Sequence, residues 1–292
     1  MDFATFLIQC LNSLQYGLLL FLVASGLTLI FGIMGVINLA HGSFYMIGAY
    51  MAYALAPVVA STFGGGFFST LGLGLVLAVI LGYVLEWVFF SFLYEREHLQ
   101  QVLMTYGLIL VFEELRSLIV GDDVYGVKPP ELLAGSLPLG EMMTYPVYRL
   151  FISGVCLALA LGMWFVFTRT RLGMMIRAGA NNREMVQSLG IDIKLLYRIV
   201  FAGGVALAVC AGMVAAPVSS VYPGMGNSVL IICFVVVVIG GIGSIRGALV
   251  AALLIGVVDT FGKVLLPEAA GVLVYVLMAL ILLWRPDGLF KA

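Results

Sequence analysis

Long apolar runs separated by short polar connections make up almost the entire chain of 292 residues. A membrane-spanning helix needs roughly 20 predominantly apolar residues, and most of these runs approach or exceed that length. The pattern predicts an all-α, polytopic integral membrane protein, a single domain over residues 1–292 with eight to nine transmembrane helices. The apolar runs are residues 6–31, 32–56, 69–92, 102–120, 147–167, 199–218, 229–239, 248–266 and 271–284.

Two of these runs are interrupted or short. Residues 32–56 open with glycines and polar side chains, so we expect a non-helical or broken opening there, and residues 229–239 stop after 11 residues at the segment GGIGSIRG. Such segments, one in each half of the chain, point to the substrate site in transport folds. The alternative is that the glycines only allow close helix packing, as Gly243 and Gly247 would in a GxxxG face.

One long stretch, residues 169–198, is both polar and basic. An excess of Lys and Arg marks the cytoplasmic side of a membrane protein, whereas the acidic loop of residues 121–146 suits the opposite side. If all nine runs cross, the amino terminus lies outside and the carboxyl terminus in the cytoplasm. The basic residues of this insert are Arg169, Arg171, Arg177, Arg183, Lys194 and Arg198.

The insert contains a short helix with recognisable ends. Asn181 is suited to cap the start of this helix, and Glu184, three residues later, is suited to bond back to the capping residue. Gly190 is suited to end the helix in a left-handed conformation. An amphipathic helix at the membrane surface is either a docking element for another subunit or an interfacial helix on lipid headgroups, and the spacing leaves both open. The apolar residues expected on one face are Met185, Val186 and Leu189.

Composition supports the membrane assignment. The chain is 63% hydrophobic and 10% charged, whereas soluble domains carry roughly 25% charged residues. The net charge of -1 gives no reason to expect a nucleic-acid partner. The four cysteines lie in apolar runs without the spacing of metal ligands, which is typical of small buried hydrophobes. They are Cys10, Cys156, Cys210 and Cys233.

Charged residues within the apolar runs need partners, because a charge at the bilayer centre costs roughly 3 kcal/mol. Asp259 with Lys263, and Glu113 with Arg116, have the spacing that lets helical neighbours pair. Each pair is either a structural ion pair or an ion-coupling site.

Three further polar residues have no evident local partner. Glu86 and Glu114 are either proton sites or residues that face the bundle interior. His41 lies between Asn38 and Gly42 in the broken segment, where it either contacts a substrate or is a satisfied structural residue.

The chain lacks the motifs of nucleotide hydrolysis and of catalysis. Gly262 and Lys263 have neither the preceding glycine nor the following Ser or Thr of a Walker motif. His41 and His98 are too far apart in the sequence to belong to a histidine-based metal motif. We therefore expect no enzymatic activity, no metal and no cofactor bound by this chain.

Four segments, in order along the chain, carry a resemblance to a known family. They are GLTLIFGIMGVINLAHGSFYMIGAY from residue 26, RLGMMIRAGANNREMVQSLGID from residue 171, GGIGSIRGALVAALLIG from residue 240 and WRPDGLF from residue 284. Together they resemble the LivH-type permeases of branched-chain amino acid ABC transporters. The similarity covers nearly the whole chain.

This resemblance implies a multi-pass permease in the bacterial inner membrane, with its amino terminus in the periplasm. It implies a LivM-like partner permease, two cytoplasmic ABC ATPases similar to LivG and LivF that use ATP and Mg, and a periplasmic substrate-binding protein. The solute is a branched-chain amino acid or a related small organic molecule. The outer loop around Asp122 and Asp123 is either a contact for the binding protein or a solvated connection.

The resemblance also implies roles for two sets of residues. The insert becomes the cytoplasmic coupling helix, and the two broken segments line or support the translocation path. The coupling residues are Arg177, Ala178, Ala180, Asn181, Arg183, Glu184, Met185, Val186, Leu189 and Gly190. The path residues are Asn38, His41, Gly42, Tyr45, Gly240, Gly241 and Gly243.

Two other functions are compatible with parts of the sequence. A self-sufficient ion-coupled transporter or channel would use Glu86 or Glu114 but has no need of the basic insert. A membrane scaffold without transport would explain the docking helix but not the two broken membrane segments.

Overall fold

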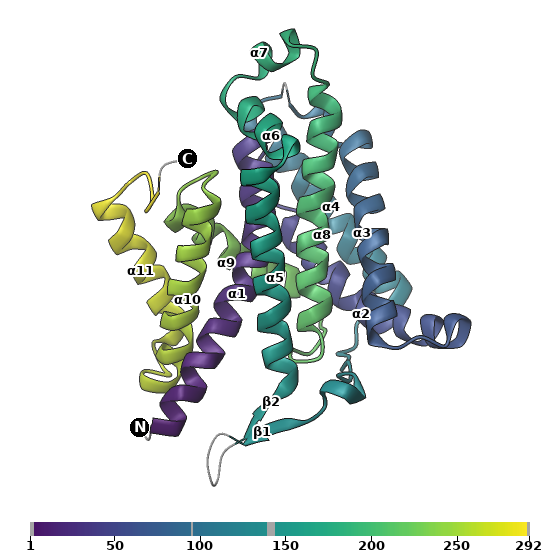
Figure 1. Cartoon of the computed structure of the whole chain (residues 1–292), viewed down its shortest axis with the longest axis vertical. Coiled ribbons are helices and arrows are strands. Elements are labelled where there is room, and N and C mark those ends of the chain that lie inside the picture. Colours follow the sequence, from purple (N-terminus) through teal and green to yellow (C-terminus); the bar gives the residue numbers. More distant parts are fainter. Residues whose placement is uncertain (1–2, 95, 139–143, 291–292) are drawn as a thin grey trace.

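A single buried helix, α1 (Phe3–Met34), is the axis of the structure. The computed structural model describes residues 3–94, 96–138 and 144–290, apart from the side chain of Phe63. α1 has 32 residues, so it is about 48 Å long. It packs against α5, α8, α9 and α10, which surround it in Figure 1.

The all-α prediction is confirmed for the described residues, with one small hairpin added. After α1, the longer helices are α2 (His41–Phe63), α3 (Phe67–Val88), α4 (His98–Val120), α5 (Val147–Arg169), α6 (Arg171–Asn181), α8 (Ile193–Ala215), α9 (Met225–Gly240), α10 (Ile245–Leu265) and α11 (Ala270–Trp284). The short elements are η1 (Phe90–Phe92), η2 (Glu131–Leu133), β1 (Ser136–Pro138), β2 (Thr144–Pro146) and α7 (Arg183–Ser188).

Each of the nine apolar runs forms a helix, but six of the described helices are long and apolar enough to span a membrane. These six are α1, α2, α3, α5, α8 and α10. The helices α9 and α11 have 16 and 15 residues, so each rises less than the roughly 30 Å of a hydrocarbon core. The remaining apolar run forms α4, which is also outside the set of six and carries Glu113, Glu114 and Arg116 toward its carboxyl end. Six of the described helices are thus candidate spans, and the further crossings that the sequence predicts stay a prediction.

The predicted break between the first two apolar runs is confirmed at residues 35–40, which are not helical. The break is narrower than predicted, because α1 continues through Gly32 and α2 begins at His41. Gly35 has a φ of +66°, and between α9 and α10 both Gly241 and Gly243 also have positive φ. Left-handed backbone at these positions favours glycine, which has no Cβ to clash.

The two ends of the bundle differ. The helices α6 and α7 lie at one end, whereas the start of α1 and the β1–β2 hairpin lie at the other (Figure 1). The hairpin is antiparallel, with Leu137 opposite Tyr145. The acidic loop that leads to it is tied to the α8–α9 connection by a bridge between Tyr125 and Val221. The basic insert and the acidic loop thus occupy opposite ends, as the charge pattern predicts.

Candidate translocation path and docking insert

The basic insert folds into two helices, α6 and α7, each with its own cap. The Thr170 hydroxyl accepts a hydrogen bond from the Gly173 amide at the start of α6. At the start of α7 the Asn182 side chain accepts one from the Met185 amide at 3.0 Å. The prediction that Asn181 is the cap is therefore wrong by one residue. Asn181 ends α6 and donates to the carbonyl of Arg177.

The predicted apolar face of the insert divides in two. Val186 is 3% exposed, whereas Met185 is 62% and Leu189 71% exposed. Successive residues of an α-helix differ by about 100°, so residues 185 and 189 point the same way while residue 186 turns aside. Val186 anchors α7 to the bundle, and Met185 and Leu189 form an outward apolar pair. Gly190 has the predicted left-handed conformation, with a φ of +83°.

The remaining residues of the predicted coupling set are all exposed. They are Arg177, Ala178, Ala180, Asn181, Arg183, Glu184 and Gly190. The insert lies at one end of the molecule (Figure 1), and Arg177, Ala180 and Asn181 also line the cleft described below.

The predicted path residues around the first break are buried. Asn38, His41, Gly42 and Tyr45 are all inaccessible or nearly so. The His41 Nε2 lies 2.9 Å from the carbonyl oxygen of Val23 in α1, so Nε2 carries the proton and Nδ1 is left as an acceptor. That Nδ1 and both amide atoms of Asn38 have no hydrogen-bond partner among the described residues.

The glycines of the predicted path serve helix packing. A Cβ on Gly42 would strike the backbone of Gly226 in α9. Gly240 and Gly247 approach each other in the same way where α9 turns into α10. These contacts favour the packing role, which the sequence left as an alternative. Of the predicted path residues, Gly243 alone lines the cleft described next.

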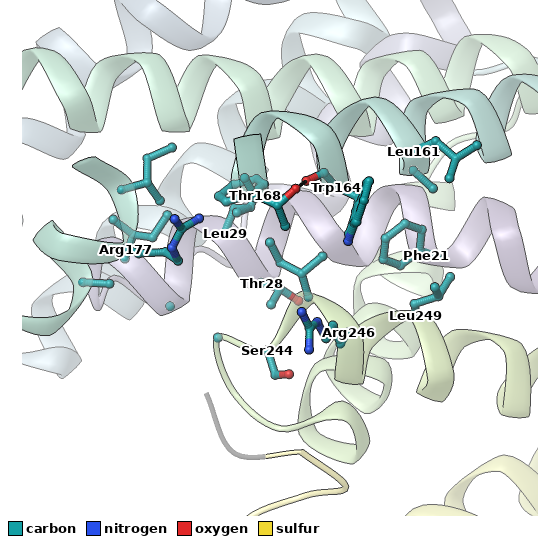
Figure 2. Close-up of a pocket in the computed structure, with 18 of the residues that line it drawn as sticks. Phe21, Thr28, Leu29, Leu161, Trp164, Thr168, Arg177, Ser244, Arg246 and Leu249 are labelled. Carbon is teal, nitrogen blue, oxygen red and sulfur yellow. Dashed lines mark hydrogen bonds between the residues drawn. The ribbon is translucent and has the colours of Figure 1, made fainter. Parts of the chain in front are cut away.

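A cleft of about 780 Å³ opens between α5 and α6 on one side and the start of α10 on the other, with α1 as its floor. Figure 2 shows Arg177, Ser244 and Arg246 around it together with Trp164, Phe21 and Leu249. Sequence reasoning missed this cleft. Its walls come from segments far apart in the chain, and each residue that lines them has the polarity expected of its own helix or connection, so no local pattern indicates a cleft.

The charged residues within the helices are paired in three cases. The predicted pairs Glu113–Arg116 and Asp259–Lys263 are present, at 3.2 Å and 2.6 Å. Glu86, which has no local partner, is paired with Arg198 at 3.0 Å.

Glu114, the second carboxylate without an evident local partner in the sequence, is exposed on α4.

In the part of the chain that the structure describes, no group of three or more His, Cys, Asp or Glu residues could hold a metal ion. The absence of a bound cofactor stays a prediction.

Long apolar helices around a buried axis, with a basic two-helix insert at one end, define a multi-pass membrane protein. The chain belongs to the family of permease components of branched-chain amino acid transport systems, whose family model matches residues 9–282.

Relatives with established names agree with this family. The chain is 30% identical to the branched-chain amino acid permease BraD of Pseudomonas aeruginosa, over 97% of this chain and 95% of the relative. It is 29% identical to the permease LivH of Escherichia coli, over 99% and 96%. It is 28% identical to a probable LivH of Methanocaldococcus jannaschii, over 95% and 90%. No solved structure matches the chain.

Proposed function

We propose that this chain is the transmembrane permease subunit of an ATP-binding cassette importer for branched-chain amino acids or related small organic solutes. The observation that carries this proposal is the family match over residues 9–282, together with full-length relatives named as high-affinity permeases of that class. A LivM-like permease completes the translocation path, two LivG- and LivF-like ATPases consume ATP with Mg in the cytoplasm, and a periplasmic binding protein delivers the solute.

In this assembly α4, α9 and α11 cross the membrane together with the six candidate spans. The end of the bundle that carries α6 and α7 faces the cytoplasm, because its excess of arginine follows the positive-inside rule. The start of α1 and the acidic loop then face the periplasm of a bacterial inner membrane. The carboxyl terminus follows nine crossings and is cytoplasmic.

The α6–α7 insert is the coupling element. Met185 and Leu189 point away from the bundle and are available to fill an apolar groove on an ATPase. Val186 is packed into the bundle, so a displacement of α7 is passed to α8 and α6, which it contacts. Rocking of these helices by the ATPases opens the path to one side at a time.

The path runs past the break between α1 and α2. The unpartnered atoms of Asn38 and His41 support this location, because buried polar groups in proteins are normally hydrogen-bonded. A polar solute or water in an opened conformation would supply the missing partners. Gly240, Gly241 and Gly243 then support the path through close backbone packing rather than by contact with the solute.

The alternative of a self-sufficient ion-coupled transporter rests on Glu86 and Glu114. The pairing of Glu86 with Arg198 favours a structural role for Glu86. Uptake by the isolated chain in liposomes, driven by an ion gradient, would support that alternative.

Co-purification with the ATPases tests the coupling role. The double variant Met185→Asp with Leu189→Asp removes the outward apolar pair, and we expect at least a roughly tenfold loss of ATPase co-purification, since buried apolar anchors dominate interface energies. The control Gln187→Asp adds charge at another exposed position of α7 and should retain the ATPases. Full solute transport by the double variant would contradict the proposal.

A further inference from the structure

The cleft of about 780 Å³ has the shape of a lengthwise groove. Its floor runs along α1 from Leu18 to Ile33, a rise of about 22 Å. Half of a hydrocarbon core measures about 15 Å, so the groove is as long as one leaflet and continues into the headgroup region. Because α1 crosses the bundle lengthwise (Figure 1), the groove follows the direction that an acyl chain takes in a membrane.

The lining of the groove changes character along its length. In Figure 2, Arg177 lies at one end, Ser244 and Arg246 lie nearer the middle, and Leu161, Phe21 and Leu249 lie toward the other end. The cationic end is the end of α6, so it is also the end of the bundle where the basic insert lies. A ligand that matches this groove is anionic at one end and apolar along the rest.

The two arginines are available for an anion. Among the described residues, neither Arg177 nor Arg246 has a carboxylate within ion-pair distance, and the lining of the groove includes no Asp or Glu. Ser244 caps α10 by accepting from the Gly247 amide. The positive end of the α10 dipole therefore adds to the charge of Arg246.

The same lining disfavours a free amino acid. The ammonium group of an amino acid needs a carboxylate or a set of carbonyl oxygens, and here it would meet two unpaired guanidinium groups. A phosphate diester matches two guanidinium groups well, because arginine binds phosphate oxygens through paired donors.

We propose that this groove binds an anionic phospholipid. Its phosphate lies between Arg177 and Arg246, and one acyl chain lies along α1 against Phe21, Leu161 and Trp164. Trp164 fits this location, because tryptophan is enriched where apolar lipid meets the headgroup layer. The bound lipid fills the space between α6 and α10 and so joins the insert to the second half of the bundle. This inference requires a membrane but not the ABC assignment.

Photolabelling tests the site on the chain purified with whatever subunits accompany it. The probe is a phosphatidylglycerol with a photoreactive group in one acyl chain, in nanodiscs of otherwise zwitterionic lipid. We expect adducts on α1 and α5, mapped by mass spectrometry. The variants Arg177→Gln and Arg246→Gln should each reduce labelling roughly fivefold, the usual contribution of one basic residue near an anionic surface. Inorganic phosphate should not compete, because it lacks the acyl chain.

Three controls separate binding in the groove from nonspecific labelling. Arg171→Gln removes an arginine from the same helix but outside the groove, and it should leave labelling unchanged. A phosphatidylcholine probe should label these helices much less. Leu161→Trp fills the apolar half without altering charge and should also reduce labelling, while the melting temperature of each variant verifies that it folds.

Several results would overturn the proposal. They are equal labelling by both probes, labelling that survives the double Arg177→Gln, Arg246→Gln substitution, and competition by inorganic phosphate. A photocrosslinking amino acid in place of Leu161 provides a further experiment, which identifies the molecule that occupies the groove. A lipid adduct there supports the proposal, whereas an adduct with a second polypeptide shows that a protein partner fills the groove instead.

Discussion

The guanidinium Nε of Arg198 lies 3.0 Å from a carboxylate oxygen of Glu86 and so joins α8 to α3. Glu86 is fully buried and also accepts a hydrogen bond from the Tyr94 hydroxyl. Arg198 lies in the first two turns of α8, shortly after α7, so this pair holds the start of α8 against α3. The sequence pattern assigns Arg198 to the membrane surface, but its guanidinium group instead neutralises the buried carboxylate of Glu86.

Breaking this pair on one side should cost much more than replacing both members. In Arg198→Met the buried carboxylate of Glu86 loses its cation, and we expect a loss of about 3 to 5 kcal/mol in the free energy of unfolding. The double variant Glu86→Leu with Arg198→Met should recover most of that loss. Denaturant unfolding in detergent measures both. Glu114→Gln, at an exposed position of α4, should stay within about 0.5 kcal/mol of the parent, and equal losses in the single and double variants would contradict the pairing.

Close packing of α8 on α2 depends on a glycine. A Cβ on Gly212 would strike the backbone oxygen of Tyr45, so Gly212→Ala should destabilise the fold by about 1 to 3 kcal/mol through overpacking. Gly203 is in the same helix and has open space at that position. Gly203→Ala should be neutral or stabilise by up to about 1 kcal/mol, because alanine favours helix. Thermal unfolding of the two variants compares them, and the reverse order would refute this packing.

The cap of α7 is a local test of the insert. Asn182→Ala removes the side chain that accepts from the Met185 amide and should cost about 1 kcal/mol of helix stability. Hydrogen exchange of the α7 amides reports this directly. Asn181→Ala is the matched control, because the Asn181 side chain bonds only to the carbonyl of Arg177. If Asn181→Ala opened α7 more than Asn182→Ala, the helix would start one residue earlier than the structure shows.

The acidic loop should respond to pH through Asp122. The Arg116 guanidinium, 2.9 Å away, holds the pKa of the Asp122 carboxyl below its usual value of 3.8, and the Ser117 hydroxyl adds to the effect. Because the pKa is lower in the folded state, the contribution to stability is complete above 3.8 and is lost as the pH falls through the folded pKa. The protection factors of the amides in residues 121–125, which compare their exchange with that of an unstructured peptide at the same pH, should therefore fall on acidification below 3.8.

Two substitutions verify the origin of that pH response. Asp122→Asn should show the lower protection factors already at neutral pH, and acidification should cause no further fall from this group. Asp123→Asn changes the neighbouring carboxylate and should leave the profile as it is. A profile that does not change in Asp122→Asn would show that another group controls the loop.

Much of the architecture was predictable from local sequence. Each apolar run forms a helix, because a stretch without polar side chains satisfies its backbone hydrogen bonds internally whatever its neighbours are. The break at residues 35–40 and the left-handed turn at Gly190 follow from glycine in the same local way. The family motifs then indicate the class of function, in agreement with the family match over residues 9–282.

The structure differs from the sequence-based predictions where two neighbouring residues could each cap a helix, or where packing against other helices determines which side chain is buried. Both Asn181 and Asn182 are good caps, and only the length of α6 selects Asn182. The inward turn of Val186 depends on where α7 meets its neighbours.

The helices, their order and the side on which positive charge gathers all depend on residues close together in the chain, so the amino-acid sequence is enough to predict them. The pairing of Glu86 with Arg198, 112 residues away, depends instead on how α3 and α8 pack together. Only the tertiary structure forms the groove that unites Arg177 with Arg246, from helices that do not follow one another in the chain. Such contacts depend on how helices pack, and side-chain shape in three dimensions, rather than periodicity along one helix, controls that packing.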